Sequence, residues 1–130
     1  MARAARGFEV RDMTKLTVAE GKAALVRRNG EAGTPARRAI TLFERPDFDV
    51  RLYAPVGADY PQTPHLRDEL YVIASGSGSF TSAGQKTSCN EGDLFFVPAG
   101  GEHGFSDLSD DFSTWVIFIG PPPGRVKIAG

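Results

Sequence analysis

The sequence contains a single cysteine, Cys89, so no disulfide can form within the chain. Such sparse cysteine usage fits a reducing compartment, and we expect the protein to be cytoplasmic. Long hydrophobic runs are also missing. Uninterrupted runs such as residues 94–97 and 115–119 are far shorter than the ~20 residues that cross a bilayer. We therefore expect no membrane partner.

A strong net charge is absent as well. The 15 basic and 16 acidic residues leave a formal charge of −1, which is too little for the electrostatic field of a nucleic-acid-binding protein. Basic pairs such as Arg27-Arg28 and Arg37-Arg38 are not interleaved with the aromatic residues that a nucleic-acid groove uses. We interpret these pairs as solvated surface and expect no nucleic-acid partner.

What the sequence does contain is a series of short apolar stretches separated by turn residues. With 130 residues, of which 41% are hydrophobic, the chain has the size and balance of one globular domain. Early in the chain, Thr17 followed by Glu20 forms a capping-box pattern, and the apolar positions after it predict a short helix up to about Arg28. Asn29-Gly30 would end that helix.

From about residue 36 the pattern becomes that of β-strands. Hydrophobic and polar residues alternate, and glycine or proline closes several of the stretches. We expect strands over residues 39–43, 50–54, 70–74, 79–82, 86–89, 94–97, 103–106 and 112–119. Short strands with a turn roughly every 8–12 residues predict an all-β sandwich or barrel.

Two histidines occur in the whole sequence, and both lie in turn-rich stretches with regular spacing. The first stretch reads Gly57, five residues, Thr63, one residue, His65, three residues, Glu69, six residues, Gly76. The second reads Gly92, five residues, Pro98, one residue, Gly100, two residues, His103, three residues, Asp107. This arrangement resembles the two motifs of the cupin superfamily, spacing for spacing.

Two positions depart from the family pattern. Thr63 stands where cupins carry the first metal-binding histidine, and Asp107 replaces the closing asparagine. The second change matters little, because aspartate and asparagine both suit that turn. The first reduces the usual set of three histidines and one glutamate to His65, Glu69 and His103.

The resemblance implies a fold, a domain plan and an assembly. The expected fold is all-β, a double-stranded β-helix or jelly-roll barrel of the cupin kind with a short N-terminal helix. The barrel would span residues 36–120. An N-terminal tail and short helix over residues 1–35 would pack on it, and residues 121–130 would form a C-terminal tail. Resemblance to small cupins also implies a homodimer.

The resemblance further implies one divalent metal ion, held by His65, Glu69 and His103. Two imidazoles and one carboxylate with open positions suit Fe(II) and also Zn²⁺, and ligand identity does not distinguish Fe, Mn, Zn or Ni. The hydroxyl of Thr63 is a poor ligand, but on a regular strand it shares a face with His65 and lines the site. Gln62 would then point away, and would ligate the ion only if the strand register shifted by one residue.

Further pocket residues are expected near these ligands. Arg51 and Arg67 are candidates to bind a substrate carboxylate, and Arg67 is the better one because it lies between two proposed ligands. Most strand aromatics would fill the barrel, with one or two touching a ligand. The full set of residues expected to lie behind the ligands or to line the pocket is Thr63, Gln62, Arg67, Tyr71, Phe96 and Trp115.

These features predict a small metal-binding cupin, and the leading hypothesis is a metal-dependent enzyme with dioxygenase-type chemistry on a small polar molecule. An isomerase-type reaction also fits, because a metal can act as a Lewis acid as well as a redox centre. Two alternatives stay open. One is a non-enzymatic cupin that binds or senses a ligand, and the other is a metal-free barrel that lost its ion with the first histidine. The fold does not decide among them, since one scaffold supports many activities.

Overall fold

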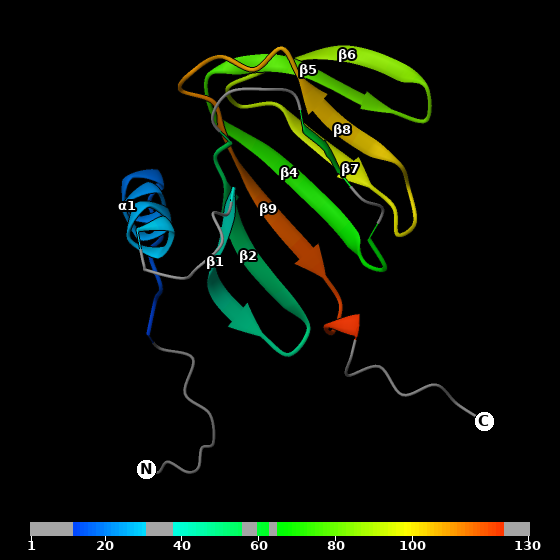
Figure 1. Ribbon diagram of the computed structural model, residues 1–130. Helices are drawn as coiled ribbons and strands as arrows, with labels where there is room; N and C mark the ends of the chain where they lie inside the picture. The colour runs from blue at the N-terminus through cyan, green and yellow to red at the C-terminus, as the bar shows by residue number, and fades with distance from the viewer. Residues whose placement is uncertain (1–11, 31–37, 56–59, 63–64, 124–130) are drawn as a thin grey trace, which may run out of the picture.

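The computed structural model describes residues 12–30, 38–55, 60–62 and 65–123 (Figure 1). Within these ranges the chain forms one α-helix followed by strands that pair in antiparallel fashion. In chain order the elements are α1 (Val18–Asn29), β1 (Ala39–Arg45), β2 (Phe48–Tyr53), β3 (Tyr60–Gln62), β4 (Asp68–Ser75), β5 (Ser77–Ser82), β6 (Gln85–Asn90), β7 (Leu94–Val97), β8 (His103–Ser106) and β9 (Ser113–Ile119). The predicted all-β class with a short N-terminal helix is confirmed.

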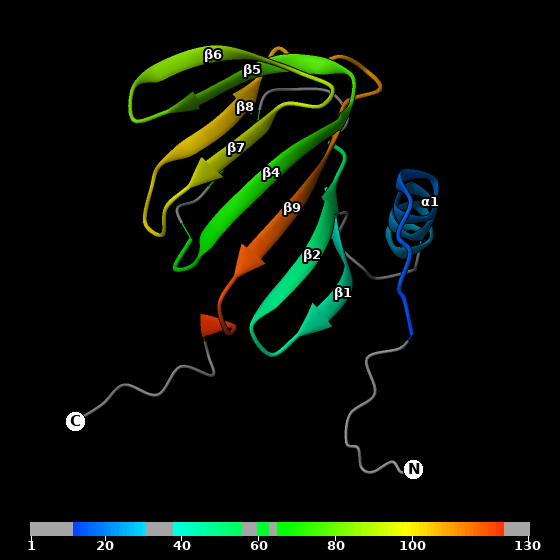
Figure 2. The same cartoon turned by 180° about the vertical axis from the view of Figure 1, so that it is seen from behind.

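The strands form two sheets, which Figure 1 and the reverse view in Figure 2 show as two layers of a jelly roll. One sheet has the order β1-β2-β9-β4-β7, and the other has the order β3-β8-β5-β6. The hydrophobic core lies between them. It contains Tyr71 and Phe118 from the first sheet and Phe80 and Phe105 from the second. The site described below lies in the same interior.

Alternation along the strands decides which side chains face this interior. On β4, Glu69, Tyr71 and Ile73 are buried, whereas Leu70 and Val72 between them are half-buried and lie on the outer face of the sheet. The inner face of the five-stranded sheet therefore carries ionisable groups directly beside the aromatic core.

Helix α1 packs on the outer face of the same sheet, beside β1 and β2 (Figure 1). Its N-cap is Thr17, whose hydroxyl oxygen accepts a hydrogen bond from the backbone N–H of Glu20 at 3.1 Å, as the capping-box pattern predicts. Gly21 is buried at the contact, and a Cβ there would lie 2.6 Å from Leu52 Cδ2. The absence of a side chain at Gly21 therefore allows the helix to approach the sheet closely.

Some strand boundaries differ from the sequence prediction. The sequence does not predict β3, because three residues around a proline carry too little alternation to be recognised. β4 begins at Asp68, two residues earlier than expected, so Glu69 belongs to the strand. The proposed domain boundaries at residues 35 and 120 stay predictions.

Candidate metal centre

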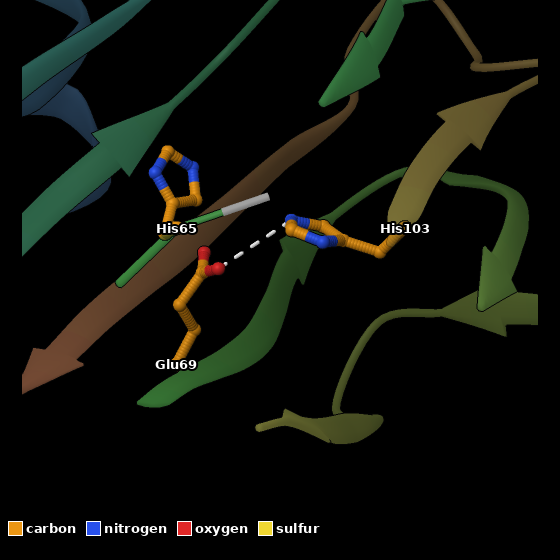
Figure 3. Close-up of side chains that lie close together, drawn as sticks. All are labelled: His65, Glu69 and His103. Carbon is orange, nitrogen blue, oxygen red and sulfur yellow. Dashed lines mark ion pairs between the residues drawn. The ribbon is translucent and has the colours of Figure 1, made fainter. Parts of the chain in front are cut away.

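Three ionisable side chains that are distant in the sequence meet between the two sheets. His65 lies in the segment that leads into β4, Glu69 is on β4, and His103 begins β8 in the opposite sheet. One potential ligand atom from each lies within 4.8 Å of the others, and His103 Nε2 is 3.5 Å from Glu69 Oε2 (Figure 3). The structure thus brings together the three residues that the sequence singles out as metal ligands.

Hydrogen bonds hold the segments that carry the two histidines against each other. The backbone N–H of Gly100 donates to the carbonyl oxygen of His65 at 2.6 Å, and the N–H of Ala99 donates to Asp68 Oδ1 at 2.8 Å. Gly100 has a φ of +81°, a conformation that glycine adopts without strain. The spacing of the second motif therefore places its turn beside His65 and leads directly into His103.

The ring of His103 is fixed by the backbone of its own segment. Its Nδ1 lies 2.9 Å from the carbonyl oxygen of Gly101. A carbonyl oxygen only accepts hydrogen bonds, so Nδ1 carries a hydrogen and donates it. Nε2 therefore faces the cluster, which is the arrangement that metal-binding histidines usually have.

The hydroxyl of Tyr71 completes the cluster. It donates a hydrogen bond to Glu69 Oε1 at 2.8 Å and lies 2.9 Å from His103 Nε2. Burial and the neighbouring Glu69 carboxylate raise the pKa of Tyr71 far above its usual value of 10. The phenol therefore keeps its proton at neutral pH, and the expectation that Tyr71 lies near the ligands agrees with this position.

The groups at the centre of the cluster have more hydrogen-bond acceptors, that is, lone pairs, than hydrogen-bond donors. Tyr71 has one hydroxyl hydrogen, which it gives to Glu69, and a neutral His103 with its hydrogen on Nδ1 presents a bare nitrogen to the same hydroxyl oxygen. Both Glu69 and His103 are buried, so water does not compensate the mismatch cheaply. A metal ion held by Glu69 and His103 would accept these lone pairs and remove the mismatch. The residues present therefore fit a divalent metal.

The surroundings of His65 favour its neutral form. Burial is the main cause that lowers its pKa from the usual 6.5, and the Glu69 carboxylate raises it, while His103, Arg51 and Arg67 lower it further. Its ring meets the edge of Phe118 at a centroid distance of 5.0 Å. A neutral imidazole has the free nitrogen lone pair that a metal ion requires.

A small cavity of about 80 Å³ opens beside the cluster. Its wall combines the cluster residues with a tyrosine and an arginine from β2 and apolar side chains from β9. The lining residues are Ala39, Arg51, Tyr53, His65, Glu69, Tyr71, Val116 and Phe118. His65 and Glu69, two of the three candidate ligands, therefore border a space that a small molecule can enter.

An ionic group lies at the edge of this cavity. The buried Asp49 carboxylate accepts hydrogen bonds from Arg51 Nε at 3.0 Å and from Arg67 Nη1 at 2.9 Å. Both guanidinium groups also lie over the ring of Phe118, with Cζ 4.4 Å and 4.6 Å from its centroid. Of the two arginines, Arg51 lines the cavity and Arg67 does not.

Three of the candidates expected around the ligands do not line the cavity. Phe96 is 55% exposed on β7, and Trp115 precedes the inward-facing Val116 on β9, so both lie on the outer face of the sheet because side chains alternate. Arg67 is turned towards Asp49 instead of the cavity, because a buried carboxylate needs a positive partner.

The two remaining candidates come from the segment before His65. Gln62 is the last residue of β3, where its backbone pairs with His103 of β8. Thr63 lies outside the described residues, so its expected place beside the ion stays a prediction.

Sequence reasoning missed the roles of Asp49 and Phe118 and ranked Arg51 below Arg67. The signal was available on β2, where Asp49, Arg51 and Tyr53 occupy alternate positions and so share a face. The apolar residues between them favour the opposite interpretation, in which the polar positions face solvent.

This fold and this site define a family, and the comparison with known proteins agrees. Residues 50–119 match the family model described as "Cupin domain". The chain therefore belongs to the cupin family, and the resemblance seen in the two motifs is confirmed. The described residues contain no helix with the length and hydropathy of a membrane span. The expected homodimer and the cytoplasmic location stay predictions.

Individual relatives extend the comparison. The chain is 36% identical over 76 residues to an uncharacterized protein of Streptomyces coelicolor, a match that covers 58% of this chain and 72% of that one. The structure resembles the DMSP lyase DddQ of Ruegeria pomeroyi with a TM-score of 0.58 and 22% identity, over 70% of this chain and 48% of the lyase. It also resembles a Cupin 2 conserved barrel domain protein of Salinispora arenicola, with a TM-score of 0.53 and 19% identity, over 62% of this chain and 73% of that one. The chain thus spans about half of the lyase, and the likeness to both structures concerns the fold.

Proposed function

We propose that the protein is a metal-dependent enzyme in which His65, Glu69 and His103 hold one divalent ion, and that it acts on a small polar molecule with dioxygenase-type chemistry. The observation that carries this proposal is the excess of lone pairs at the buried centre of the cluster, where Glu69, His103 and Tyr71 meet. A bound ion would supply a Lewis-acid and redox centre beside the cavity. Two imidazoles and a carboxylate with open positions are the ligand set of many non-haem Fe(II) oxygenases.

The chain's own residues would prepare the site in three ways. The Gly101 carbonyl holds the ring of His103 in one orientation, and the Tyr71 hydroxyl orients the carboxylate of Glu69. Burial lowers the pKa of His65 and so keeps its lone pair available near neutral pH. The small cavity, walled in part by Val116 and Phe118, limits the water that reaches a bound molecule.

A non-oxidative reaction, such as isomerisation or elimination, is the second candidate. The observation in its favour is the Tyr71 hydroxyl, which lines the cavity, stays protonated, and could turn its hydrogen bond from Glu69 to an oxygen of a bound molecule. The fold similarity to a DMSP lyase shows that a structure of this kind can support elimination chemistry in another protein. A ligand-binding protein without catalysis and a metal-free barrel remain as the outcomes that the test must exclude.

The test begins with the metal. The purified protein would be stripped, reloaded in turn with Fe(II), Mn(II), Zn(II) and Ni(II), and analysed for bound metal. We expect about one equivalent of ion in the wild type and loss of stoichiometric binding in His103→Ala. The matched control is Glu102→Gln, a change at the exposed neighbour of His103, and it should bind like the wild type. If the wild type binds less than a tenth of an equivalent of each ion tested, the metal proposal fails and the protein is a metal-free barrel.

The second step separates an enzyme from a binder. Oxygen consumption by the Fe(II)-loaded protein would be followed with a panel of small thiols and carboxylates. Substrate-dependent uptake supports dioxygenase-type chemistry. Product formation without oxygen uptake supports the non-oxidative candidate, and binding without turnover shows a ligand-binding protein.

A further inference from the structure

The ionic group at the cavity edge carries an excess of positive charge. Asp49 contributes one negative charge, and Arg51 and Arg67 contribute one positive charge each. The side chains of Asp49 and Arg67 are almost fully enclosed, with exposed fractions of 7% and 10%. This partly enclosed group has a net charge of +1, and the Glu69 carboxylate on the same cavity wall carries the opposite charge. A cation held by Glu69 would leave the positive charge of the arginines uncompensated, and the cavity would then attract an anion, because an uncompensated charge away from water is unfavourable.

The two guanidinium groups are used differently. Arg67 points Nη1 at Asp49 and lies off the cavity wall, whereas Arg51 pairs with the same carboxylate mainly through Nε. Arg51 Nη2 makes only a long contact of 3.5 Å to Asp49, and Nη1 makes no hydrogen bond to the part of the chain that the structure describes. Arg51 therefore keeps terminal donors in a side chain that is 33% exposed and lines the cavity.

Phe118 fixes where these donors lie relative to the cluster. The Cζ atom of Arg51 lies 4.4 Å from the centre of the Phe118 ring, and the His65 ring meets the same phenyl ring at 5.0 Å. The guanidinium and the imidazole therefore border one short space. With a cavity of about 80 Å³, and a liquid volume of roughly 30 Å³ for each water, that space admits a molecule of only a few non-hydrogen atoms.

We propose that Arg51 binds the carboxylate of a small monocarboxylic acid in this cavity and points the rest of the molecule towards His65, Glu69 and His103. A planar guanidinium matches a carboxylate with two parallel hydrogen bonds. The single positive charge of the ionic group matches a monoanion, and Asp49 behind Arg51 disfavours an anion of higher charge. This inference names the substrate class and rests on the proposed function, because the same cavity borders the candidate metal site.

The test uses propionate as the probe and propionamide as its neutral counterpart. Their binding to the full chain, both metal-free and loaded with Zn(II), would be measured by ligand-observed NMR titration. We expect propionate to bind at least about tenfold more tightly than propionamide, the size expected for a hydrogen bond to a charged partner. Inorganic phosphate is the competing anion and should bind more weakly than propionate.

Substitutions locate the effect. Arg51→Met should lose about tenfold or more in propionate affinity without changing propionamide binding, and its Asp49 keeps Arg67 as partner. Arg51→Lys keeps the positive charge but lacks the planar guanidinium. Its affinity for propionate should lie between that of the wild type and that of Arg51→Met. Arg45→Met removes an exposed arginine at the end of β1 and is the matched control, for which wild-type affinity is expected.

The outcomes separate this inference from the metal proposal. Equal affinity for acid and amide, no measurable binding of propionate, an unchanged affinity in Arg51→Met, or tighter binding of phosphate each overturns the assignment, whatever the zinc content. If the wild type binds propionate through Arg51 but no zinc, the carboxylate site stands and the metal proposal fails. If Arg51→Met still binds zinc but no longer binds propionate, both the carboxylate site and the metal site are supported.

Discussion

The two faces of the five-stranded sheet are formed by the same strands but have different roles: the inner face carries the candidate metal centre, and the outer face packs against α1. On β4, Glu69 and Tyr71 face the interior and form part of the candidate centre, whereas Leu70 and Val72 face outward. On β2, Arg51 reaches the cavity and the next residue, Leu52, packs under α1. Neighbouring residues of one strand thus face opposite sides of the sheet, so that one lies at the candidate site and the next contributes to packing.

The contrast shows how a small barrel can bury charged groups at tolerable cost. Two buried carboxylates on the inner face of this sheet have defined partners: Asp49 pairs with two arginines, and Glu69 accepts a hydrogen bond from Tyr71. The outer face contributes apolar packing, and its fully buried part lies where α1 covers Leu52. Substitutions on the outer face should therefore change stability alone, whereas substitutions of the polar groups on the inner face should also change metal or ligand binding.

The largest effect is expected on the outer face. Leu52→Ala removes a fully buried side chain under α1 and should lower the free energy of unfolding by about 2–5 kcal/mol. Urea denaturation measures the loss, and hydrogen exchange should show faster exchange in α1. Val26→Ala truncates an exposed apolar residue of the same helix and should change stability only slightly. A stable Leu52→Ala protein that no longer binds metal would contradict the division between the faces.

On the inner face, Glu69→Gln should chiefly affect metal binding. The isosteric change removes the carboxylate charge of the cluster, and we expect the affinity for Zn(II) to fall by at least about 100-fold, since even the outer partners of metal ligands change affinity by roughly 10–100-fold. Competition titration with a chelator measures it, with Glu102→Gln as the control. The adjacent outer variant Leu70→Ala should keep its affinity for Zn(II) while losing stability.

Tyr71→Phe should have an intermediate effect that depends on the metal. Without the hydroxyl, buried Glu69 Oε1 loses its donor, which should destabilise the metal-free protein by about 1–3 kcal/mol. A bound cation would satisfy the same carboxylate, so the loss should be smaller in the Zn(II)-loaded protein. Paired denaturation curves with and without Zn(II) give both values. An equal loss in the two states would argue that a bound ion does not contact Glu69 Oε1.

The smallest effect concerns pH. The pKa of His65 in the folded protein lies below its usual value of 6.5, so between the two values the unfolded chain binds a proton that the folded chain does not. Acidification through this window should therefore lower the stability of the metal-free protein, and stability should be regained as the pH rises above 6.5. Thermal melting over this range checks the sign. His65→Gln removes the titrating group, and its melting temperature should vary less with pH than that of the wild type.

The fold was largely predictable from the sequence, and the candidate site was predictable in part. Turn residues and period-two alternation gave the all-β class, and the spacing of the two motifs brought His65, Glu69 and His103 to attention because such spacing reflects strand and turn geometry. Which face a strand residue occupies was harder to predict. Phe96 and Trp115 have the aromatic character of core residues, yet register places them outside.

The ionic group could not be inferred from local pattern. Asp49 and Arg67 are 18 positions apart in the sequence, and their contact depends on how β2 approaches the segment before β4 across the intervening β9. Short-range periodicity describes a single strand, whereas this pairing is a property of the assembled sheet. Local pattern therefore could not show that Arg51 lines the cavity and that Arg67 does not.

One consequence follows from the placement of the three candidate ligands. Glu69 belongs to one layer of the jelly roll and His103 to the other, with Tyr71 between them. Any ion bound there would act as a cross-link between the layers and would raise the free energy of unfolding with the logarithm of the free ion concentration once that concentration exceeds the dissociation constant. In a metal-starved cell, cellular proteases would then remove the empty protein first, so that its abundance follows the supply of the ion.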